Sequence, residues 1–405
     1  MNVLMLLFKD LHNDARVVRE ANALAKKGYI VHIACLQEYD HEPKEELHEN
    51  VYVNRIPILS KKAKKSLGGY KPSQTRKKTS LAFKIIRSPY IKLAKDFTGY
   101  GEFYRKILKS YNQMNFKVVH CHDLNTLPTG YYLSRKFQAK LIFDAHELFN
   151  EMSGRNELDR TIGYKLEEYF LPKADQVITV NPFMEEEMKK KYGNFPSTIL
   201  QNTPEDIVEE EGRAVPDLRS LYGLSKNDIL LIYQGGLSQQ RGLDLCIEAL
   251  RDLPNEYKMV YIGDGPLKES LKAKAEEEKV NDRFFLHEKV PAKDLLLYTK
   301  QADVGLVMYE NLSKNNYYST PNKIFEYMLA GIPAVASNHP GKSYIVTEEG
   351  TGVCTSEDAH SIAEAVMNIM EDYEHYKSTC LRKKSRFTWE VEQDKLVSLY
   401  KTLTK

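Results

Sequence analysis

The sequence predicts an α/β protein that is built from two doubly wound parallel sheets. Short apolar segments alternate with amphipathic segments in both halves of the chain, and this alternation is typical of parallel sheets covered by helices. A chain of 405 residues is long enough for two domains. The acidic, proline-containing stretch at 202–216 marks the boundary. We therefore expect Rossmann-like domains at 1–203 and 204–385, followed by a terminal helix at 386–405.

In the first half, apolar runs of strand length predict a series of buried strands. Residues 16–28 carry apolar side chains at three- and four-residue spacing, so they predict an amphipathic helix that Gly28 ends. The expected strands are residues 3–8, 29–36, 51–56, 117–122, 140–146, 176–180 and 197–200.

The second half follows the same pattern. Helices are expected at 243–253 and 266–279. The expected strands are residues 229–236, 258–266, 283–288, 302–309, 333–337 and 351–354.

Residues 320–337, TPNKIFEYMLAGIPAVAS, read as a loop, a helix, a glycine turn and a buried strand. Thr320 suits the N-cap, Pro321 suits the first helical position, and Gly331 ends the helix. A helix that begins at the carboxyl edge of a parallel sheet points free amides at a ligand, which favours a diphosphate.

The composition is that of a globular protein, with 42% hydrophobic and 28% charged residues. No apolar run approaches the ~20 residues of a membrane-spanning helix, and the first apolar run reads as a strand and not as a signal peptide. The cysteines have neither metal-ligand nor redox spacing, so free thiols in a reducing cytoplasm are expected.

A basic segment at 61–95 stands out although the net charge is only +2. No acidic residue lies between Glu49 and Asp96, and apolar side chains interleave with the cations. Such a segment could lie on anionic lipid headgroups, or it could be a solvated loop followed by a packed helix. Nucleic-acid binding is not expected, because no aromatic stacking pattern or recognised module accompanies the charge.

Several second-half residues fit a bound nucleotide diphosphate. Arg241 precedes a helix start, where a cation opposes the helix dipole unless a phosphate holds it. Gly235, Gly236 and the Gly-rich turn at Gly263 allow a close approach of backbone to ligand. The carboxylate of Glu326 would repel a phosphate, but it can accept hydrogen bonds from two ribose hydroxyls.

Two first-half strands end in histidine and acid. His122 and Asp123 end one strand, and Asp144, His146 and Glu147 end another, so all five should face the crevice of an open sheet. A zinc site from His120, His122 and His146 is conceivable, but a third ligand is not assured and no metal is expected. His120 alone reads as a core histidine.

The loop after the first strand carries three further polar residues. Asn13 and Asp14 are expected to cap the following helix, and Arg16 to reach the crevice.

The stretch at 320–337 resembles the donor-site motif of the GT-B-fold retaining glycosyltransferases, family four (group 1). The family pattern is a glutamate, seven residues and a second glutamate, then a small residue, Gly-x-Pro and an apolar strand. Glu326 matches the second glutamate, whereas Tyr318 stands at the first, which in the family contacts the transferred sugar. Pro321, Asn322 and Lys323 resemble a variant common among polysaccharide-assembly members.

The resemblance implies a GT-B architecture with the nucleotide sugar bound by the second domain. Glu326 would bind the ribose, and Arg241 would bind the diphosphate. One usual cation is replaced by Gly236, and Lys323 would compensate. His122 matches the histidine that contacts the acceptor or the reacting sugar. Residues 386–405 resemble the terminal helix that crosses back onto the first domain.

In this family a retaining transfer needs no carboxylate nucleophile, and no Asp-x-Asp motif occurs in the chain. Neither a cofactor nor a metal is therefore expected. Family frequency favours a UDP-sugar donor, and the basic segment favours a glycan or lipid-linked acceptor. The expected location is the cytoplasm, peripheral on the inner face of the plasma membrane.

Three alternatives remain at this point. The first is a sugar-nucleotide epimerase on the same fold. The second is a catalytically silent sugar-nucleotide-binding partner subunit, which the departures at Tyr318 and Gly236 favour. The third, a nicotinamide dehydrogenase, is weak because no G-x-G-x-x-G follows the first strand.

Overall fold

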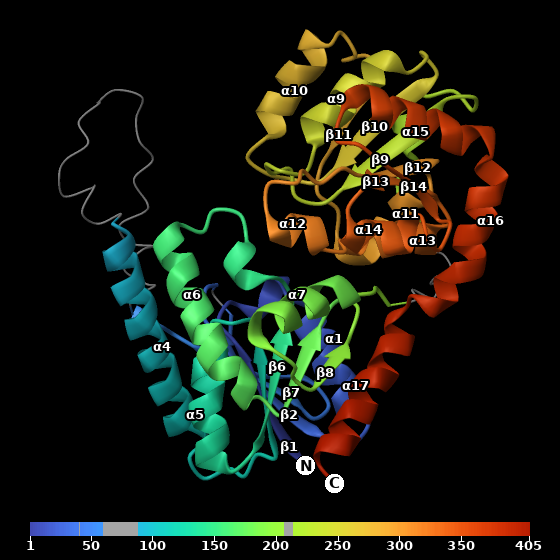
Figure 1. Ribbon diagram of the computed structural model, residues 1–405. Coiled ribbons are helices and arrows are strands. Elements are labelled where there is room, and N and C mark those ends of the chain that lie inside the picture. Colours follow the sequence, from blue (N-terminus) through green and yellow to red (C-terminus); the bar gives the residue numbers. More distant parts are fainter. Residues whose placement is uncertain (40, 60–87, 206–213) are drawn as a thin grey trace. The chain divides into compact units, whose positions relative to one another are not determined.

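The computed structural model describes residues 1–39, 41–59, 88–205 and 214–405, apart from the side chain of Asn13. The chain forms two compact units (Figure 1). Unit 1 consists of Met1–Leu200 and Gln393–Lys405, and unit 2 of Gln201–Glu392. The last residues of the chain therefore belong to the same unit as the first.

Unit 1 is built on one mostly parallel sheet with the strand order β3-β4-β2-β1-β5-β6-β7-β8. Every described pairing in it is parallel except that of β3 with β4. The strand order reverses between β1 and β5, and ligands of open α/β sheets bind beyond the carboxyl ends of strands at such a reversal. The strands are β1 (Asn2–Leu7), β2 (Ile30–Leu36), β3 (Lys44–His48), β4 (Val51–Ile56), β5 (Val118–His122), β6 (Lys140–Ala145), β7 (Gln176–Thr179) and β8 (Ser197–Ile199).

Strand β3 was not predicted from the sequence. Its residues, KEELH, are charged and alternate between exposed and half-buried, so the segment lacks the apolar signal of the other strands. Charged side chains on an edge strand oppose pairing with a second chain, which explains why β3 is polar.

Helices α4, α5 and α6 pack against one another in unit 1 (Figure 1). Asp14 caps α1 as predicted, because its carboxylate accepts a hydrogen bond from Val17 N at 3.2 Å. The helices are α1 (Ala15–Ala25), α4 (Pro89–Tyr111), α5 (Leu127–Phe137), α6 (Glu157–Phe170), α7 (Pro182–Tyr192) and α17 (Trp389–Leu403), with short 3-10 turns η1 (Leu11–Asn13), η2 (Phe149–Glu151) and η3 (Leu171–Lys173).

Unit 2 contains a parallel sheet with the order β11-β10-β9-β12-β13-β14, which reverses between β9 and β12. Its strands are β9 (Ile229–Gln234), β10 (Tyr257–Ile262), β11 (Phe284–His287), β12 (Val304–Val307), β13 (Ala334–Ser337) and β14 (Gly352–Thr355). Its helical segments are α8 (Leu218–Leu221), α9 (Leu243–Asp252), α10 (Lys268–Glu277), α11 (Ala292–Thr299), α12 (Lys314–Tyr318), α13 (Asn322–Ala330), α14 (Pro340–Val346), α15 (Ala359–Glu371), α16 (Tyr373–Lys383) and η4 (Lys384–Arg386).

Helix α13 is anchored on this sheet by Tyr327. The Tyr327 hydroxyl donates to the carbonyls of Ile232 at 3.2 Å and Leu306 at 3.3 Å, on the two strands where the order reverses. Gly305 makes room for the ring, because a Cβ there would lie 2.2 Å from Tyr327 Cδ2. The position of α13 at the reversal therefore depends on one tyrosine and one glycine.

The start of α13 differs from the prediction by one residue. Pro321 is the N-cap and not the first helical residue. The predicted N-cap, Thr320, donates its hydroxyl to the carbonyl of Gly341 at 2.5 Å instead. Gly331 ends the helix in the left-handed conformation, with φ 77°, as predicted.

Residues 61–87 of the basic segment lie outside the described residues, and residues 88–95 lead into and begin α4. Among the described residues, no helix combines the length and the hydropathy needed to cross a membrane. All five cysteines are free thiols.

Candidate functional site

In unit 2, Arg241 and Lys323 come together around one tyrosine ring. Tyr309 lies just beyond the carboxyl end of β12, with Arg241 Cζ 4.0 Å and Lys323 Nζ 5.3 Å from its ring centre. Lys323 Nζ also lies 4.0 Å from the ring centre of Tyr233, near the end of β9. Both predicted cations thus lie at the point where the strand order reverses.

A third cation, Lys342 on α14, was not predicted. Its Nζ lies 5.2 Å from the Tyr309 ring centre and donates to the carbonyls of Asn316 at 2.6 Å and Ser319 at 3.2 Å. Lys342 is completely buried. A single lysine after a proline-glycine pair gives no local signal of burial, so the sequence alone could not identify it.

The cluster of Arg241, Lys323 and Lys342 carries positive charge without a paired anion in the described part of the chain. No carboxylate among the described residues lies within ion-pair distance of Arg241, Lys323 or Lys342. Burial, reinforced by the charge of Arg241, lowers the pKa of Lys323 to about 7, and burial likewise lowers the pKa of Lys342 to about 7. Cations that are this costly to bury indicate a site for an anionic ligand.

Glu326, one turn further along α13, is held by a residue that sequence reasoning missed. Gln234, the last residue of β9, donates from its side-chain amide to the Glu326 carboxylate. The same Gln234 accepts a hydrogen bond from the Thr299 hydroxyl at 2.6 Å, which fixes the direction of the amide. Glu326 itself is half-buried.

The predicted glycines take different roles. A Cβ on Gly263 would lie 1.9 Å from the Gly235 carbonyl, so Gly263 is required for the two loops to meet. Gly235 has φ 128°, and a Cβ there would lie 3.4 Å from Lys323 Nζ. Gly236 is exposed and open to solvent, and its carbonyl accepts from Tyr233 at 2.8 Å. Gly235 and Gly236 therefore leave the approach to Lys323 clear.

Three further predicted donor-side residues lie on the segment that leads into α13. Tyr318 is the last residue of α12, Pro321 is half-buried, and Asn322 is exposed at the first position of α13. The Tyr318 carbonyl would lie 2.1 Å from a Cβ on Gly341, so α14 packs tightly against this segment.

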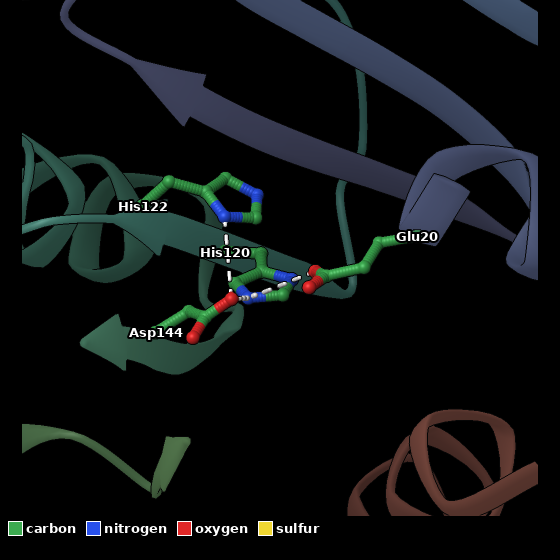
Figure 2. A group of neighbouring side chains, drawn as sticks. All are labelled: Glu20, His120, His122 and Asp144. Carbon is green, nitrogen blue, oxygen red and sulfur yellow. Dashed lines mark ion pairs between the residues drawn. The ribbon is translucent and has the colours of Figure 1, made fainter. Parts of the chain in front are cut away.

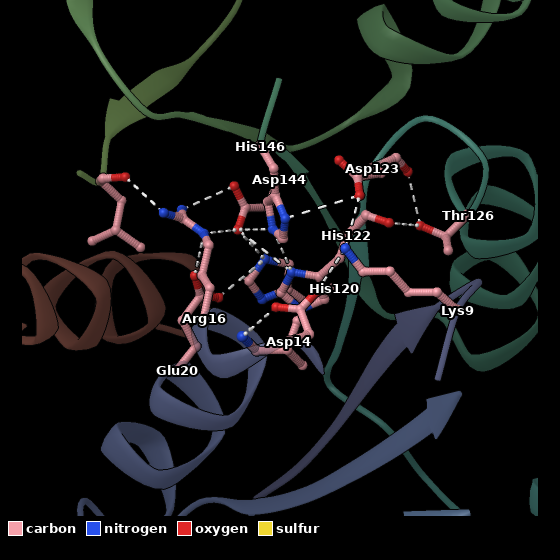
Figure 3. Close-up of polar contacts among 12 residues, drawn as sticks. Lys9, Asp14, Arg16, Glu20, His120, His122, Asp123, Thr126, Asp144 and His146 are labelled. Atoms are coloured by element: carbon pink, nitrogen blue, oxygen red, sulfur yellow. Dashed lines mark hydrogen bonds and ion pairs between the residues drawn. The ribbon is translucent and has the colours of Figure 1, made fainter. Parts of the chain in front are cut away.

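In unit 1, Arg16 and Asp144 form the centre of a buried polar cluster (Figure 3). Arg16 donates twice to the Asp144 carboxylate at 3.1 Å, pairs with Glu20 at 2.9 Å, and donates to the Leu200 carbonyl at 3.0 Å. Arg16 was expected to reach the crevice, and its side chain is buried, with all of these partners inside unit 1. Asp144, which was expected to face the crevice, is completely buried.

His122 and His146, which were both expected to face the crevice, lie in contact with each other. His146 Nε2 lies 3.1 Å from both Asp144 Oδ2 and His122 Nδ1. Burial alone would lower the pKa of His146, but the carboxylates of Asp144 and Asp123 outweigh it and raise this pKa to about 9. Burial and the charged His146 lower the pKa of His122. His146 is therefore charged at neutral pH, whereas His122, which is completely buried, is neutral.

Asp123 lies at the end of β5 in a left-handed conformation, with φ 66°. His146 Nδ1 lies 3.9 Å and Lys9 Nζ 3.8 Å from its carboxylate. Lys9, which was not predicted, also pairs with Asp14 at 2.8 Å. Non-glycine residues with this conformation are uncommon and concentrate at functional sites.

The remaining predicted residues of unit 1 lie on its loops. Glu147 is half-buried and helps to raise the pKa of Lys9. Asn13 lies in η1, and its side chain is outside the described part of the chain.

Four side chains come close enough to suggest a metal centre, namely Glu20, His120, His122 and Asp144, with one ligand atom each within 4.8 Å (Figure 2). The His120 and His122 rings are stacked, with centroids 4.3 Å apart and planes 28° apart. A metal must lie close to the plane of each imidazole that binds it, and stacked rings do not allow this for one shared ion. Arg16 already pairs with both carboxylates. The cluster is therefore arranged around an internal guanidinium.

His120 is a buried core histidine, as expected. Its Nδ1 lies 2.8 Å from the hydroxyl of Tyr400 on α17, so the last helix of the chain contacts the centre of unit 1.

The raised pKa of His146 predicts a pH-dependent stability. Because this pKa of about 9 exceeds the ordinary 6.5, the charged imidazole contributes its full stability below pH 6.5 and loses it as the pH rises through 9. We expect this contribution, roughly 3 kcal/mol of unfolding free energy, to be lost over this range, so the stability difference between the wild type and His146→Gln should shrink by that amount. Urea unfolding at pH 6 and pH 9.5 measures it. The exposed His360→Gln is the control, and equal pH dependence in His146→Gln and the wild type would contradict the assignment.

Two family models match adjoining parts of the chain. Residues 15–202 match the model described as Glycosyltransferase Family 4, and residues 216–386 match Glycosyl transferases group 1. The first match covers most of unit 1, and the second covers most of unit 2.

Two curated relatives share 29% and 22% sequence identity with this chain over the aligned residues. A GDP-mannose-dependent alpha-(1-6)-phosphatidylinositol dimannoside mannosyltransferase of Mycobacterium tuberculosis is 29% identical over 171 residues, which is 40% of this chain and 41% of the relative. A D-inositol 3-phosphate glycosyltransferase of Xylanimonas cellulosilytica is 22% identical over 312 residues, 72% of this chain and 73% of the relative. The chain thus spans less than half the length of the mycobacterial relative.

Solved structures match over the full length. Sucrose-phosphate synthase from Thermosynechococcus elongatus has a TM-score of 0.77 at 18% identity and covers 100% of this chain and 99% of its own. Anabaena Alr3699/HepE in complex with UDP has a TM-score of 0.71 at 13% identity. The match covers 99% of this chain and 100% of the Anabaena chain. These likenesses establish the fold. Together with the family matches, they show that the chain belongs to the GT-B-fold glycosyltransferases of group 1.

Proposed function

We propose that this chain transfers a sugar from a nucleotide-diphosphate sugar to a glycan or lipid-linked acceptor, with retention of anomeric configuration. One observation carries the proposal: Arg241, Lys323 and Lys342 surround Tyr309 without a paired carboxylate among the described residues. They lie where the strand order of unit 2 reverses, which is the usual ligand position in such sheets.

The donor diphosphate would bind between Arg241 and Lys323, with the free amides at the start of α13 completing the anion site. Guanidinium grips phosphate through two N–H bonds, and the ammonium adds a point charge. Glu326, oriented by Gln234, would accept hydrogen bonds from the ribose hydroxyls. Gly235, Gly236 and Gly263 would leave space for the diphosphate.

In the proposed reaction the bond from the anomeric carbon to the diphosphate breaks as the acceptor oxygen attacks from the same face. The departing phosphate oxygen takes the acceptor's proton, and Arg241 and Lys323 stabilise the charge that develops on the diphosphate. Asp123, His146 and Glu147 would contact the acceptor or the reacting sugar, and the buried His122 would position His146 through the contact between their rings. Tyr318 would take the place of the family's sugar-contacting glutamate. No metal or cofactor takes part in this scheme.

The names of similar proteins support a range of donors and acceptors. The Anabaena structure contains UDP, whereas the mycobacterial relative uses GDP-mannose. Other relatives are named for teichuronic acid, amylovoran and colanic acid biosynthesis. A UDP-sugar donor and an acceptor in surface polysaccharide or glycolipid assembly are the proposal here. The protein would act in the cytoplasm, in peripheral contact with anionic lipid through residues 61–95.

Titration calorimetry with UDP-glucose, GDP-mannose and ADP-glucose tests the donor site. These doubly esterified diphosphates do not titrate near neutral pH, so any proton uptake on binding comes from the protein. A bound anion raises the pKa of Lys323 above about 7. We expect nearly one proton to be taken up at pH 8 and affinity to fall up to tenfold per pH unit above pH 7.

Lys323→Arg is the matched control, because arginine stays charged and should bind with little proton uptake. Addition of EDTA should leave binding and turnover unchanged. If none of the three nucleotide sugars binds, the proposed donor site is wrong. Product analysis without an acceptor then separates the alternatives, because an epimerase converts the donor alone and a silent binder leaves it unchanged.

A further inference from the structure

Residues 310–320 of unit 2, here called the α12 segment, lie between β12 and α13. They contain α12 and Tyr318, the residue that takes the place of the sugar-contacting glutamate in the proposed function. The two halves of this segment are held by different parts of unit 2, so a substitution can release one half and leave the other in place.

The first half of the α12 segment is held by the loops before α9 and after β14. Glu310 N donates to the Gln240 carbonyl at 3.2 Å, and Asn311 N donates to the Glu357 carboxylate at 2.9 Å. Gln240 directly precedes Arg241 in the chain. These bonds hold the loop that carries Arg241 without a contribution from α14.

The second half of the α12 segment is held by α14 through Lys342. The Lys342 ammonium donates to the carbonyl of Asn316 at 2.6 Å and to that of Ser319 at 3.2 Å, one on either side of Tyr318. Carbonyls at the end of a helix lack partners within the helix, and a cation there satisfies them. Lys342 is completely buried, so its ammonium, and not bulk water, satisfies these carbonyls.

The backbone around Tyr318 packs directly against the start of α14. A Cβ on Gly341 would lie 2.1 Å from the Tyr318 carbonyl and 2.6 Å from the Ser319 carbonyl, so only a glycine fits there. The Thr320 hydroxyl donates to the Gly341 carbonyl at 2.5 Å. Lys342 therefore completes a tight junction between α14 and the backbone that carries Tyr318.

Lys342 differs from Arg241 and Lys323 in the groups that its charge contacts. Arg241 and Lys323 lie over aromatic rings, whereas the Lys342 ammonium is directed at two carbonyls, which use two of its three N–H donors. Burial of an ammonium is costly, and Lys342 has no ion-paired carboxylate in the described part of unit 2. The geometry suits Lys342 to hold the α12 segment, while the other two cations serve the diphosphate.

We infer that Lys342 is a positioning residue, which fixes the second half of the α12 segment and thereby holds Tyr318 against the sugar of the bound donor. The presence of a donor sugar rests on the proposed function, whereas the contacts of Lys342 do not. Because Arg241 is held by other bonds, loss of the Lys342 ammonium should affect the sugar and spare the nucleotide.

Calorimetry on Lys342→Met tests this inference. The probes are the nucleotides UDP, GDP and ADP and the nucleotide sugars UDP-glucose, GDP-mannose and ADP-glucose. Methionine keeps an apolar stem and removes the ammonium. We expect the affinity for the free nucleotide to change by less than about threefold. The affinity for the matching nucleotide sugar should fall about tenfold, the size expected for one lost hydrogen-bonded contact.

A double-variant cycle identifies the residue through which Lys342 acts. Lys342→Met should weaken nucleotide-sugar binding far less in Tyr318→Ala than in the wild type, because the contact that Lys342 positions is already absent. Lys342→Gln keeps a donor for one carbonyl and should recover part of the loss. Lys226→Met, at an exposed lysine in the turn before β9, is the matched control and should bind like the wild type.

Thermal melts identify folded variants. If Lys342→Met does not fold, Lys342→Gln gives the same test, with a smaller loss that is still confined to the nucleotide sugar. The inference is overturned if the folded variant weakens nucleotide and nucleotide sugar equally, if it changes neither, or if the effects of Lys342→Met and Tyr318→Ala are additive. In each of these cases the wild type still binds a nucleotide sugar. A failure of the proposed function differs, because then no nucleotide or nucleotide sugar binds the wild type, and the inference fails with it.

Discussion

Arg241→Ala is expected to slow sugar transfer by ~10²–10³-fold, the cost of removing one group that stabilises a developing anion. The guanidinium of Arg241 lies 4.0 Å from the Tyr309 ring centre and just before α9. A cation at a helix start is unfavourable unless an anion holds it. Steady-state rates of nucleotide release at saturating donor measure the effect on turnover directly.

Compensation by Lys323 should limit the loss of donor affinity in this variant. Because the charge of Arg241 helps to lower the pKa of Lys323, its removal should leave Lys323 more fully protonated at neutral pH. Arg251→Ala, an exposed arginine on α9 that pairs with Asp252 and Glu278, is the control and should keep full activity. Near-full turnover in Arg241→Ala would refute the assignment of the diphosphate to this cluster.

Arg16→Leu is expected to destabilise unit 1 by about 3–5 kcal/mol, the cost of leaving buried charges without their partner. Arg16 makes two hydrogen bonds to Asp144, and both side chains are essentially inaccessible to solvent. Burial alone would raise the pKa of Asp144, but Arg16 and His146 hold it well below its ordinary range. Urea unfolding at pH 7, followed by far-UV circular dichroism, measures the loss.

Two comparisons separate this effect from a general loss of folding. Arg105→Leu on α4, where the arginine is exposed, should change stability by less than about 0.5 kcal/mol. Adding Asp144→Asn to Arg16→Leu should recover part of the stability, because the uncompensated carboxylate is then absent. Nucleotide-sugar binding by unit 2 should persist. An unchanged stability in Arg16→Leu would mean that the ion pair is not formed in solution.

The strands were predictable because most are buried on both faces, so they read as continuous apolar runs. Strand β3 could not be predicted in this way, and the predicted role of Thr320 as N-cap was wrong. β3 is charged because it lies at an edge. Thr320 has a local sequence suited to capping, but the Gly341 carbonyl takes its hydroxyl instead. Contacts with a distant segment decided both outcomes, and no local pattern encodes them.

The same reasoning applies to the polar residues. Arg241 could be singled out because it is a cation near a helix start, an arrangement that needs an explanation within a few residues of sequence. Lys323 was identified through the resemblance of Pro321, Asn322 and Lys323 to a variant of the family motif. Gln234 and Lys342 gave no such signal, and Asp144 was expected only to face the crevice. Asp144 acts through Arg16, which lies 128 residues earlier, and only the folded sheet brings the two together. Local physical chemistry therefore finds residues with unfavourable surroundings and misses those that are satisfied by distant partners.

The contact between Tyr400 and His120 bears on how the chain is made. Residues 1–200 emerge from the ribosome long before residues 393–405, yet both segments belong to unit 1. The hydroxyl that meets His120 is translated only after all of unit 2. The half of the protein that is synthesised first is therefore completed last, after unit 2 has already emerged, although domains generally fold in order from the N-terminus during synthesis.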